Sequence, residues 1–170
     1  MLDNFKADVK RYGKFNLYVL FEQGLWAIAV YRFGRWAKDI KIPLIGFLFR
    51  FFAFLLFKWI EIITGISVPA SASIGKGFYI GHFGGIILHS DVVMGENCSI
   101  GPGVLIGTRG LGNLGVATIG NNVYIGVGAK VLGKITIGNN VRIGANSVVL
   151  SDIPDNSTVV GIPARQVEHK

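Results

Sequence analysis

The sequence has few of the residues that mark several common protein classes. Its single cysteine, Cys98, excludes a disulfide framework and a zinc site built from several cysteines. Charged residues make up only 16% of the chain and hydrophobic residues 51%, so a mainly disordered chain is excluded. The first residues contain no apolar stretch of the kind that a secretory signal requires, and we therefore expect a cytoplasmic protein.

The sequence also has little that points to nucleotides or nucleic acids. No G-K-[ST] phosphate loop occurs, and the glycine-containing run 101–106 departs from the G-x-G-x-x-G fingerprint. The 17 Lys and Arg residues exceed the 10 Asp and Glu residues, which gives a formal net charge of +7. These basic residues are dispersed, whereas a groove-binding surface needs them clustered, so we expect no nucleic-acid partner.

Composition divides the chain near residue 66. Residues 1–66 hold ten of the 12 Phe, and residues 67–170 hold 19 of the 24 Gly. We therefore expect a helical N-terminal region, 1–66, and a glycine-rich domain, 67–170. In the first region no strong breaker interrupts residues 16–40, which predicts a helix. A second helix is predicted from Pro43, a favoured first-turn residue, to Thr64, just before a glycine.

The predicted helix 43–64 is unusually apolar. Arg50 is its only charge between Leu44 and Phe57, and Arg50, Lys58 and Glu61 fall on one stripe about 80° wide at 100° per residue. Such a helix packs between subunits, lies in a membrane interface, or spans the bilayer, although a span needs about 20 apolar residues. Sequence favours packing between subunits, and peripheral contact of residues 43–64 with the inner face of the membrane is the main alternative.

The second region repeats every six residues, with a longer period of 18. Aliphatic residues recur at positions 119, 125, 131, 137, 143 and 149, and the segment 119–126 recurs as 137–144. A helix predicts a period near 3.6 and a strand a period of 2, so neither explains six within 18. A three-sided solenoid does explain it, because each coil has three short strands with one inward aliphatic residue each. Glycine and asparagine fit its corners.

Two interruptions of the six-residue register mark candidate functional segments. Two extra residues lie between Ile80 and Met94, in a stretch that contains His82-Phe83-Gly84-Gly85. Thirteen residues separate Ile106 from Ile119, which predicts that a loop, residues 108–117, leaves the solenoid. Solenoid proteins commonly carry their function on such insertions.

These repeats resemble those of the hexapeptide-repeat acyltransferases. The fold implied is mainly β, a left-handed parallel β-helix preceded by an α-helical N-terminal region. The resemblance is closest to the serine acetyltransferase branch, especially its short members associated with polysaccharide O-acetylation, over the stretches 29–36, 80–86, 125–133, 143–149 and 153–165. It implies a homotrimer with active sites between neighbouring solenoids, and acetyl-CoA as co-substrate without a metal.

The resemblance also implies site residues. His82 is the candidate catalytic base, since a neutral imidazole can take the proton of a hydroxyl as it attacks a thioester carbonyl. His89 and His169 receive no role, and Cys98 receives a structural one. The positions that match the acetyl-CoA site, with the arginines meeting phosphates, are Gly107, Thr108, Val127, Arg142, Ala145 and Arg165. The acceptor is expected near Ser67, Phe83 and Arg109.

The sequence departs from serine acetyltransferases where that family carries charge. Ser67, Gly81, Ser90, Gly115 and Val116 stand where the family has Asp, Asp, Glu, Arg and His in turn. Charge-assisted contacts are the strong ones, so their loss should weaken recognition of a small zwitterion. We therefore expect an O-acetyltransferase that acts on a sugar or polysaccharide precursor. Serine O-acetylation or amino-sugar N-acetylation is the alternative, and a non-catalytic trimeric scaffold is an alternative of another class.

Overall fold

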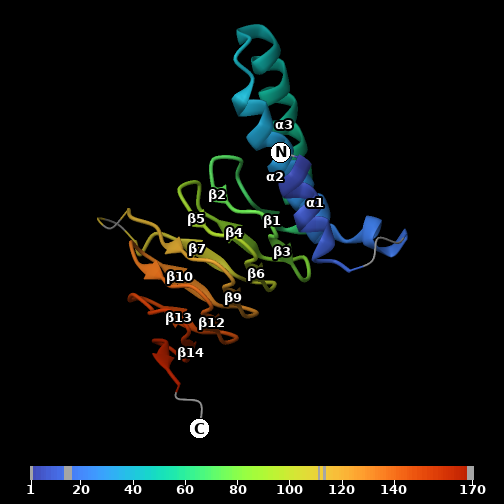
Figure 1. Cartoon of the computed structure of the whole chain (residues 1–170). Helices are drawn as coiled ribbons and strands as arrows, with labels where there is room; N and C mark the ends of the chain where they lie inside the picture. The colour runs from blue at the N-terminus through green and yellow to red at the C-terminus, as the bar shows by residue number, and fades with distance from the viewer. Residues whose placement is uncertain (1, 14–16, 111, 113, 168–170) are drawn as a thin grey trace.

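The computed structural model describes residues 2–13, 17–110, 112 and 114–167, in which helices precede a β-solenoid (Figure 1). The helical elements of this part of the chain are α1 (Leu2–Lys10), the 3₁₀ helix η1 (Leu17–Phe21), α2 (Gln23–Asp39) and α3 (Pro43–Thr64). Helices α2 and α3 form an antiparallel hairpin whose tip points away from the solenoid (Figure 1). Strand β14 (Thr158–Val160) lies at the opposite end of the solenoid (Figure 1).

The two helix predictions had different outcomes. Helix α3 has the predicted bounds, because Gly65 adopts the left-handed conformation (φ 65°) and donates its N–H to the carbonyl of Glu61 at 2.9 Å. The single helix expected over 16–40 was wrong, since the structure divides it into η1 and α2. The division occurs at Glu22, whose backbone is extended (φ −71°, ψ 109°). Residue 16 itself lies outside the described residues.

The solenoid has three faces of stacked strands, and successive strands from β1 to β14 pass from one face to another. The first face contains β1 (Ile66–Ser67), β4 (Ile86–Leu88), β7 (Leu105–Gly107), β10 (Lys130–Leu132) and β13 (Val148–Val149). The second contains β2 (Ser73–Ile74), β5 (Val93–Met94), β8 (Thr118–Ile119) and β11 (Thr136–Ile137). The third contains β3 (Tyr79–Ile80), β6 (Ser99–Ile100), β9 (Tyr124–Ile125), β12 (Arg142–Ile143), β14 (Thr158–Val160) and the antiparallel β15 (Arg165–Gln166).

The strand register confirms the solenoid that the six-residue period predicts. On the third face Ile80, Ile100, Ile125 and Ile143 are successive Cα partners, and all four are buried. Each coil therefore adds one inward aliphatic residue per face to a continuous core. The corners use asparagine in the left-handed conformation, with φ between 56° and 58°, at Asn97, Asn122, Asn140, Asn146 and Asn156. Asparagine tolerates this conformation better than most residues do.

A buried ion pair fastens α1 and α2 to the first coil. Arg32 of α2 donates from Nε to Asp8 Oδ2 at 2.8 Å, and both side chains are almost fully buried. Asp8 Oδ1 also accepts the backbone N–H of Phe78 at 2.8 Å, and Arg32 Nη1 donates to the carbonyl of Ile74 at 2.7 Å. The pair and its backbone contacts join three elements that lie far apart in the sequence.

Candidate active site

His82 lies on the corner between β3 and β4, in the segment where the register breaks. Five residues separate Ile80 from Ile86 there, whereas three separate Ile100 from Val104 in the next coil. The longer corner needs glycine, because Gly84 and Gly85 have φ of 102° and 65°. The insertion thus lifts His82 and the exposed side chain of Phe83 out of the regular coil.

The His82 corner is held from both sides by backbone hydrogen bonds. Gly84 N–H donates to the carbonyl of Thr64, the last residue of α3, at 3.0 Å. On the other side the N–H of Gly103, in the next coil, donates to the carbonyl of Gly84 at 2.9 Å. The candidate base therefore sits directly between the end of α3 and the regular solenoid, on a corner whose backbone is fixed.

Two of the predicted acetyl-CoA residues share this corner with His82. His82, Val127 and Ala145 each come second after the strand isoleucines that are in register on the third face. The N–H of Gly128 donates to the carbonyl of Pro102, and that of Asn146 to the carbonyl of Val127, both at 2.8 Å. Coils repeat at about 4.8 Å, so Val127 lies roughly 10 Å and Ala145 roughly 15 Å from the level of His82. These residues form a continuous corner column.

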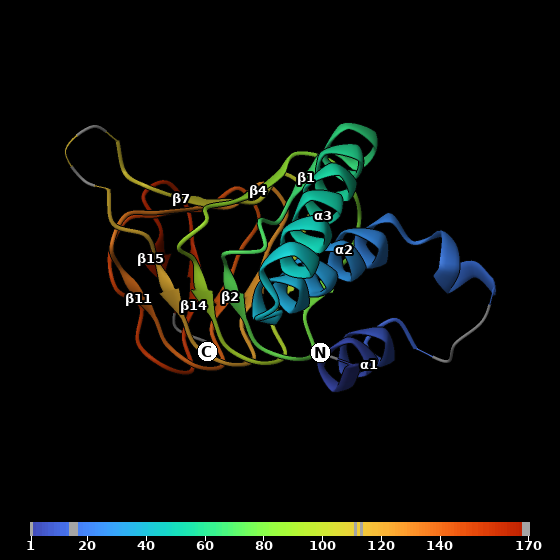
Figure 2. The same cartoon turned by 90° about the horizontal axis from the view of Figure 1, so that it is seen from above.

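The loop residues lie at a different corner. Gly107 ends β7, and residues 108–117 connect it to β8 on the second face; Figure 2 shows this loop extending away from the solenoid. Arg109 Nη1 lies 3.5 Å from the carbonyl of Leu150. Leu111 and Asn113 lie outside the described residues. Within one chain, the first face separates Gly107, Thr108 and Arg109 from His82.

Glycines of this loop have the spacing of a dinucleotide-binding fingerprint. Gly110, Gly112 and Gly115 do match the G-x-G-x-x-G spacing, although the run 101–106 does not. The segment connects two strands of a solenoid and is followed by β8, not by a helix. A dinucleotide fingerprint requires a helix N-terminus after the turn, so the match carries no such site.

The two predicted phosphate-binding arginines lie on the third face instead of the corner column. Arg142 belongs to β12 and lines a groove of about 620 Å³ together with Arg11, Ser99 and Tyr124. Arg11 donates to the Ser99 hydroxyl oxygen at 2.8 Å, and this hydrogen bond links the residue that follows α1 to the solenoid. Arg165 lies on β15 at the C-terminal end. The six-residue period places these residues in coils but does not show which surface each one faces.

Ser67 lies on β1 next to the end of α3. Hydrogen bonds to the Glu61 carboxylate, from Lys58 at 2.6 Å and from Ser67, lower the pKa of Glu61 below its ordinary value.

Sequence analysis missed Lys130, whose ammonium group reaches from β10 to the carbonyl of Gly103 beside the corner column. The sequence offers little indication of this contact, since an outward lysine on a strand is an ordinary surface residue.

Metal and thiol chemistry have no support among the described residues. They contain no group of three or more His, Cys, Asp or Glu that could hold a metal ion. His89 follows β4 at another corner, where its Nδ1 accepts the N–H of Asp91 at 3.2 Å, and His169 lies outside the described residues. Burial raises the pKa of the Cys98 thiol to about 11, so it stays protonated at neutral pH and fits a core residue.

Comparison with known proteins agrees with this geometry. Residues 117–151 match the family model described as bacterial transferase hexapeptide (six repeats). Serine acetyltransferase of Helicobacter pylori J99 is 42% identical over 150 residues, which cover 88% of this chain and 84% of that protein. The chain belongs to the hexapeptide-repeat transferase family. Its solenoid is therefore the left-handed parallel β-helix that this family shares.

Other members of the hexapeptide-repeat transferase family differ in length and in name. Serine acetyltransferase of Synechococcus elongatus is 39% identical over 145 residues, and the chain spans only 57% of its length. The acetyltransferase WcaB of Escherichia coli K12, named for colanic acid biosynthesis, is 45% identical over 105 residues, 62% of this chain and 65% of that protein. The Brucella abortus serine acetyltransferase solved with coenzyme A superposes with a TM-score of 0.84 at 29% identity, covering 98% of this chain and 67% of that one.

Proposed function

We propose that the chain is an acetyl-CoA-dependent O-acetyltransferase with His82 as its general base. The observation that supports this is the corner column, in which His82, Val127 and Ala145 each come second after isoleucines that are in register on the third face. Small residues at the lower corners let a pantetheine arm lie against the backbone. Relatives that are named acetyltransferases, one of them solved with coenzyme A, support the same donor.

The reaction follows from the chemistry of an imidazole beside a thioester. His82 takes the proton of the acceptor hydroxyl while the hydroxyl oxygen attacks the acetyl carbonyl carbon. The resulting oxyanion is stabilised by a backbone N–H at a glycine-rich corner. The intermediate then collapses with loss of the C–S bond, and the imidazolium returns its proton to the departing thiolate. The products are the acetyl ester and free coenzyme A thiol.

Two acceptors are supported by different observations. L-serine is supported by the relatives, most of which carry the name serine acetyltransferase. A sugar hydroxyl is supported by the residues themselves, because Ser67, Gly81, Ser90, Gly115 and Val116 give a zwitterion no charged partner. The WcaB relative supports the same acceptor class. The proposal includes both, with serine as the first acceptor to test.

A homotrimer is part of the proposal. In one chain the first face lies between His82 and the loop that carries Thr108 and Arg109. A cyclic assembly of parallel solenoids would let the loop of one subunit reach the His82 corner of the next. The protein would then have three equivalent sites.

The test is thiol release from acetyl-CoA with saturating L-serine, measured against a blank without acceptor. His82→Ala should lower kcat by a factor of about 10²–10⁴, the usual contribution of a general base. His89→Ala is the matched control and should keep wild-type turnover. Near wild-type activity in His82→Ala would refute the mechanism. Bound acetyl-CoA without serine turnover would direct the assay to glycan acceptors, and failure to bind acetyl-CoA would favour the non-catalytic scaffold.

A further inference from the structure

Helix α3 presents a large apolar surface that the described chain does not cover. With a mean hydropathy of 1.8 over its most apolar stretch, it is long and apolar enough to cross a membrane by length and composition. Its buried residues Gly46, Ala53 and Thr64 follow one face, which packs on α2 and the solenoid. The exposed outer face consists of Leu44, Ile45, Phe47, Leu48, Phe49, Phe51, Phe52, Leu55, Trp59, Ile62 and Ile63.

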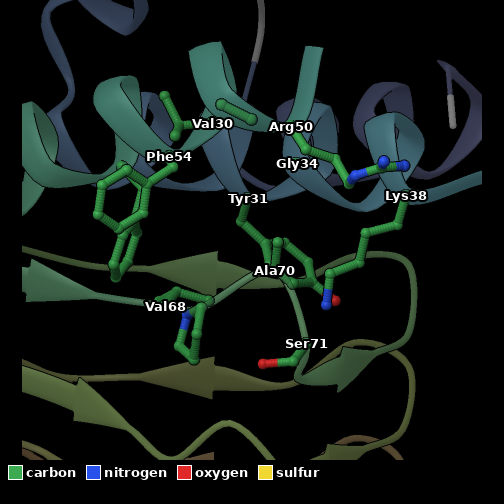
Figure 3. A pocket seen from close by; sticks show the side chains of 12 residues that line it. Val30, Tyr31, Gly34, Lys38, Arg50, Phe54, Val68, Ala70 and Ser71 are labelled. Carbon is green, nitrogen blue, oxygen red and sulfur yellow. The ribbon is translucent and has the colours of Figure 1, made fainter. Parts of the chain in front are cut away.

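The packing of α3 against the solenoid excludes a membrane-spanning helix. Phe54 and Phe57 line a cavity of about 260 Å³ together with Val68 and Ser71 of the first coil, and Phe54 points from α3 toward that coil (Figure 3). Glu61 contacts Ser67 on β1. The second half of α3 therefore lies along the protein, and only its outer face is free to meet an apolar phase.

The outer face is too wide for one partner helix. At 100° per residue its apolar side chains cover about 200° of the circumference, whereas the seam between two packed helices uses a much narrower stripe. A bilayer can cover whatever arc is immersed in it. Five aromatic side chains lie on the outer face, namely Phe47, Phe49, Phe51, Phe52 and Trp59. Such side chains suit the boundary between headgroups and acyl chains.

Charge distinguishes a lipid surface from a second copy of this chain. Lys38 and Arg50 line the same cavity, between the helix pair and the first coil (Figure 3). Within the described residues, neither has a carboxylate at ion-pair distance. Residues 1–66 carry ten basic and five acidic residues, so a second copy would bring the same positive excess. Anionic headgroups would neutralise it.

We infer that the outer face of α3 docks in the interface of an anionic phospholipid bilayer, whose negative surface attracts the basic excess of residues 1–66. The aromatic and aliphatic side chains enter the acyl boundary, while the solenoid stays in water. This goes beyond the proposed acetyl transfer and does not depend on it, because thiol release in solution is measured separately.

The test is co-sedimentation of the purified full chain with phospholipid vesicles. Vesicles with about one quarter phosphatidylglycerol should pellet the protein, and pure phosphatidylcholine should bind it more weakly. Phe51→Asp should abolish binding, and the matched control Tyr124→Asp, an aromatic exposed on the third face, should retain it. Raising the salt concentration should weaken binding to the anionic vesicles, because salt screens the attraction between the basic excess and the headgroups.

Two results would overturn the inference. One is wild-type protein that stays in the supernatant with both kinds of vesicle. The other is Phe51→Asp protein whose light-scattering mass falls while vesicle binding is unchanged, because the outer face would then be an interface between copies. Unchanged far-ultraviolet circular dichroism and thermal unfolding of the variants show that they are folded.

Discussion

At the scale of single residues, the buried Asp8–Arg32 pair has more influence on stability than any surface charge. Both groups are removed from water, and each also satisfies backbone groups of the first coil. Removing one partner of such a pair leaves an uncompensated buried charge, which is far more costly than never having had the pair. The pair is therefore a sensitive test of how the N-terminal helices are attached.

Asp8→Ala should lower the free energy of unfolding by about 3–5 kcal/mol, because Arg32 stays buried without its carboxylate. Urea unfolding followed by circular dichroism measures the change. The control is Glu61→Gln, which weakens the exposed pair with Lys58 and should cost less than about 1 kcal/mol. Equal losses in the two variants would show that the buried pair does not hold α1 in place.

At the scale of elements, the corners of the third face depend on asparagine. Asn122 donates from Nδ2 to Asn140 Oδ1 at 3.0 Å, and Asn140 donates in the same way to Asn156 at 2.9 Å. All three residues have φ near 57°. These amide hydrogen bonds run along an exposed edge of the solenoid. We therefore expect the left-handed backbone conformation to contribute more to stability than the amide hydrogen bonds do.

Asn140→Ala should therefore lower the stability by up to about 1–2 kcal/mol, because alanine lacks the local side-chain hydrogen bonding that lets asparagine tolerate the left-handed conformation. Asn140→Gly removes the same amide hydrogen bonds, but glycine adopts the left-handed conformation without strain. The decrease in stability of this variant should therefore be clearly smaller. Thermal unfolding of the two variants side by side measures the difference. If glycine proves as damaging as alanine, the amide ladder would be the main contribution.

The elements also show what the sequence could and could not predict. The solenoid was predictable because each coil repeats the same inward aliphatic position, and α3 was predictable because Pro43 and Gly65 mark its ends. Helix α1 was not, since its place depends on the contact between Asp8 and a residue 24 positions later. The proposal of His82 as the base rests on a break in the period together with the family resemblance. The face on which Arg142 and Arg165 lie was not predictable, because the period shows which coil holds a residue but not which surface of the solenoid it lies on.

At the scale of the whole molecule, the separation of the His82 corner from the loop makes assembly the central question. We expect light scattering of the purified protein to give three times the 18.4 kDa mass of the chain. Dilution that dissociates the trimer should abolish thiol release in parallel, because each site would need two subunits. A fully active monomer would contradict both the assembly and the shared site.

The hydrogen bond from Gly84 to Thr64 bears on the side from which each substrate would reach His82. It ties the reactive corner to the end of α3, so an anchored protein would hold His82 at the coil nearest the lipid. Val127 and Ala145 would lie on coils farther into the water. A soluble thioester could then arrive from the aqueous side while an acceptor carried on a lipid arrived from the membrane side. The two substrates would approach along separate routes and meet without competing for one entrance.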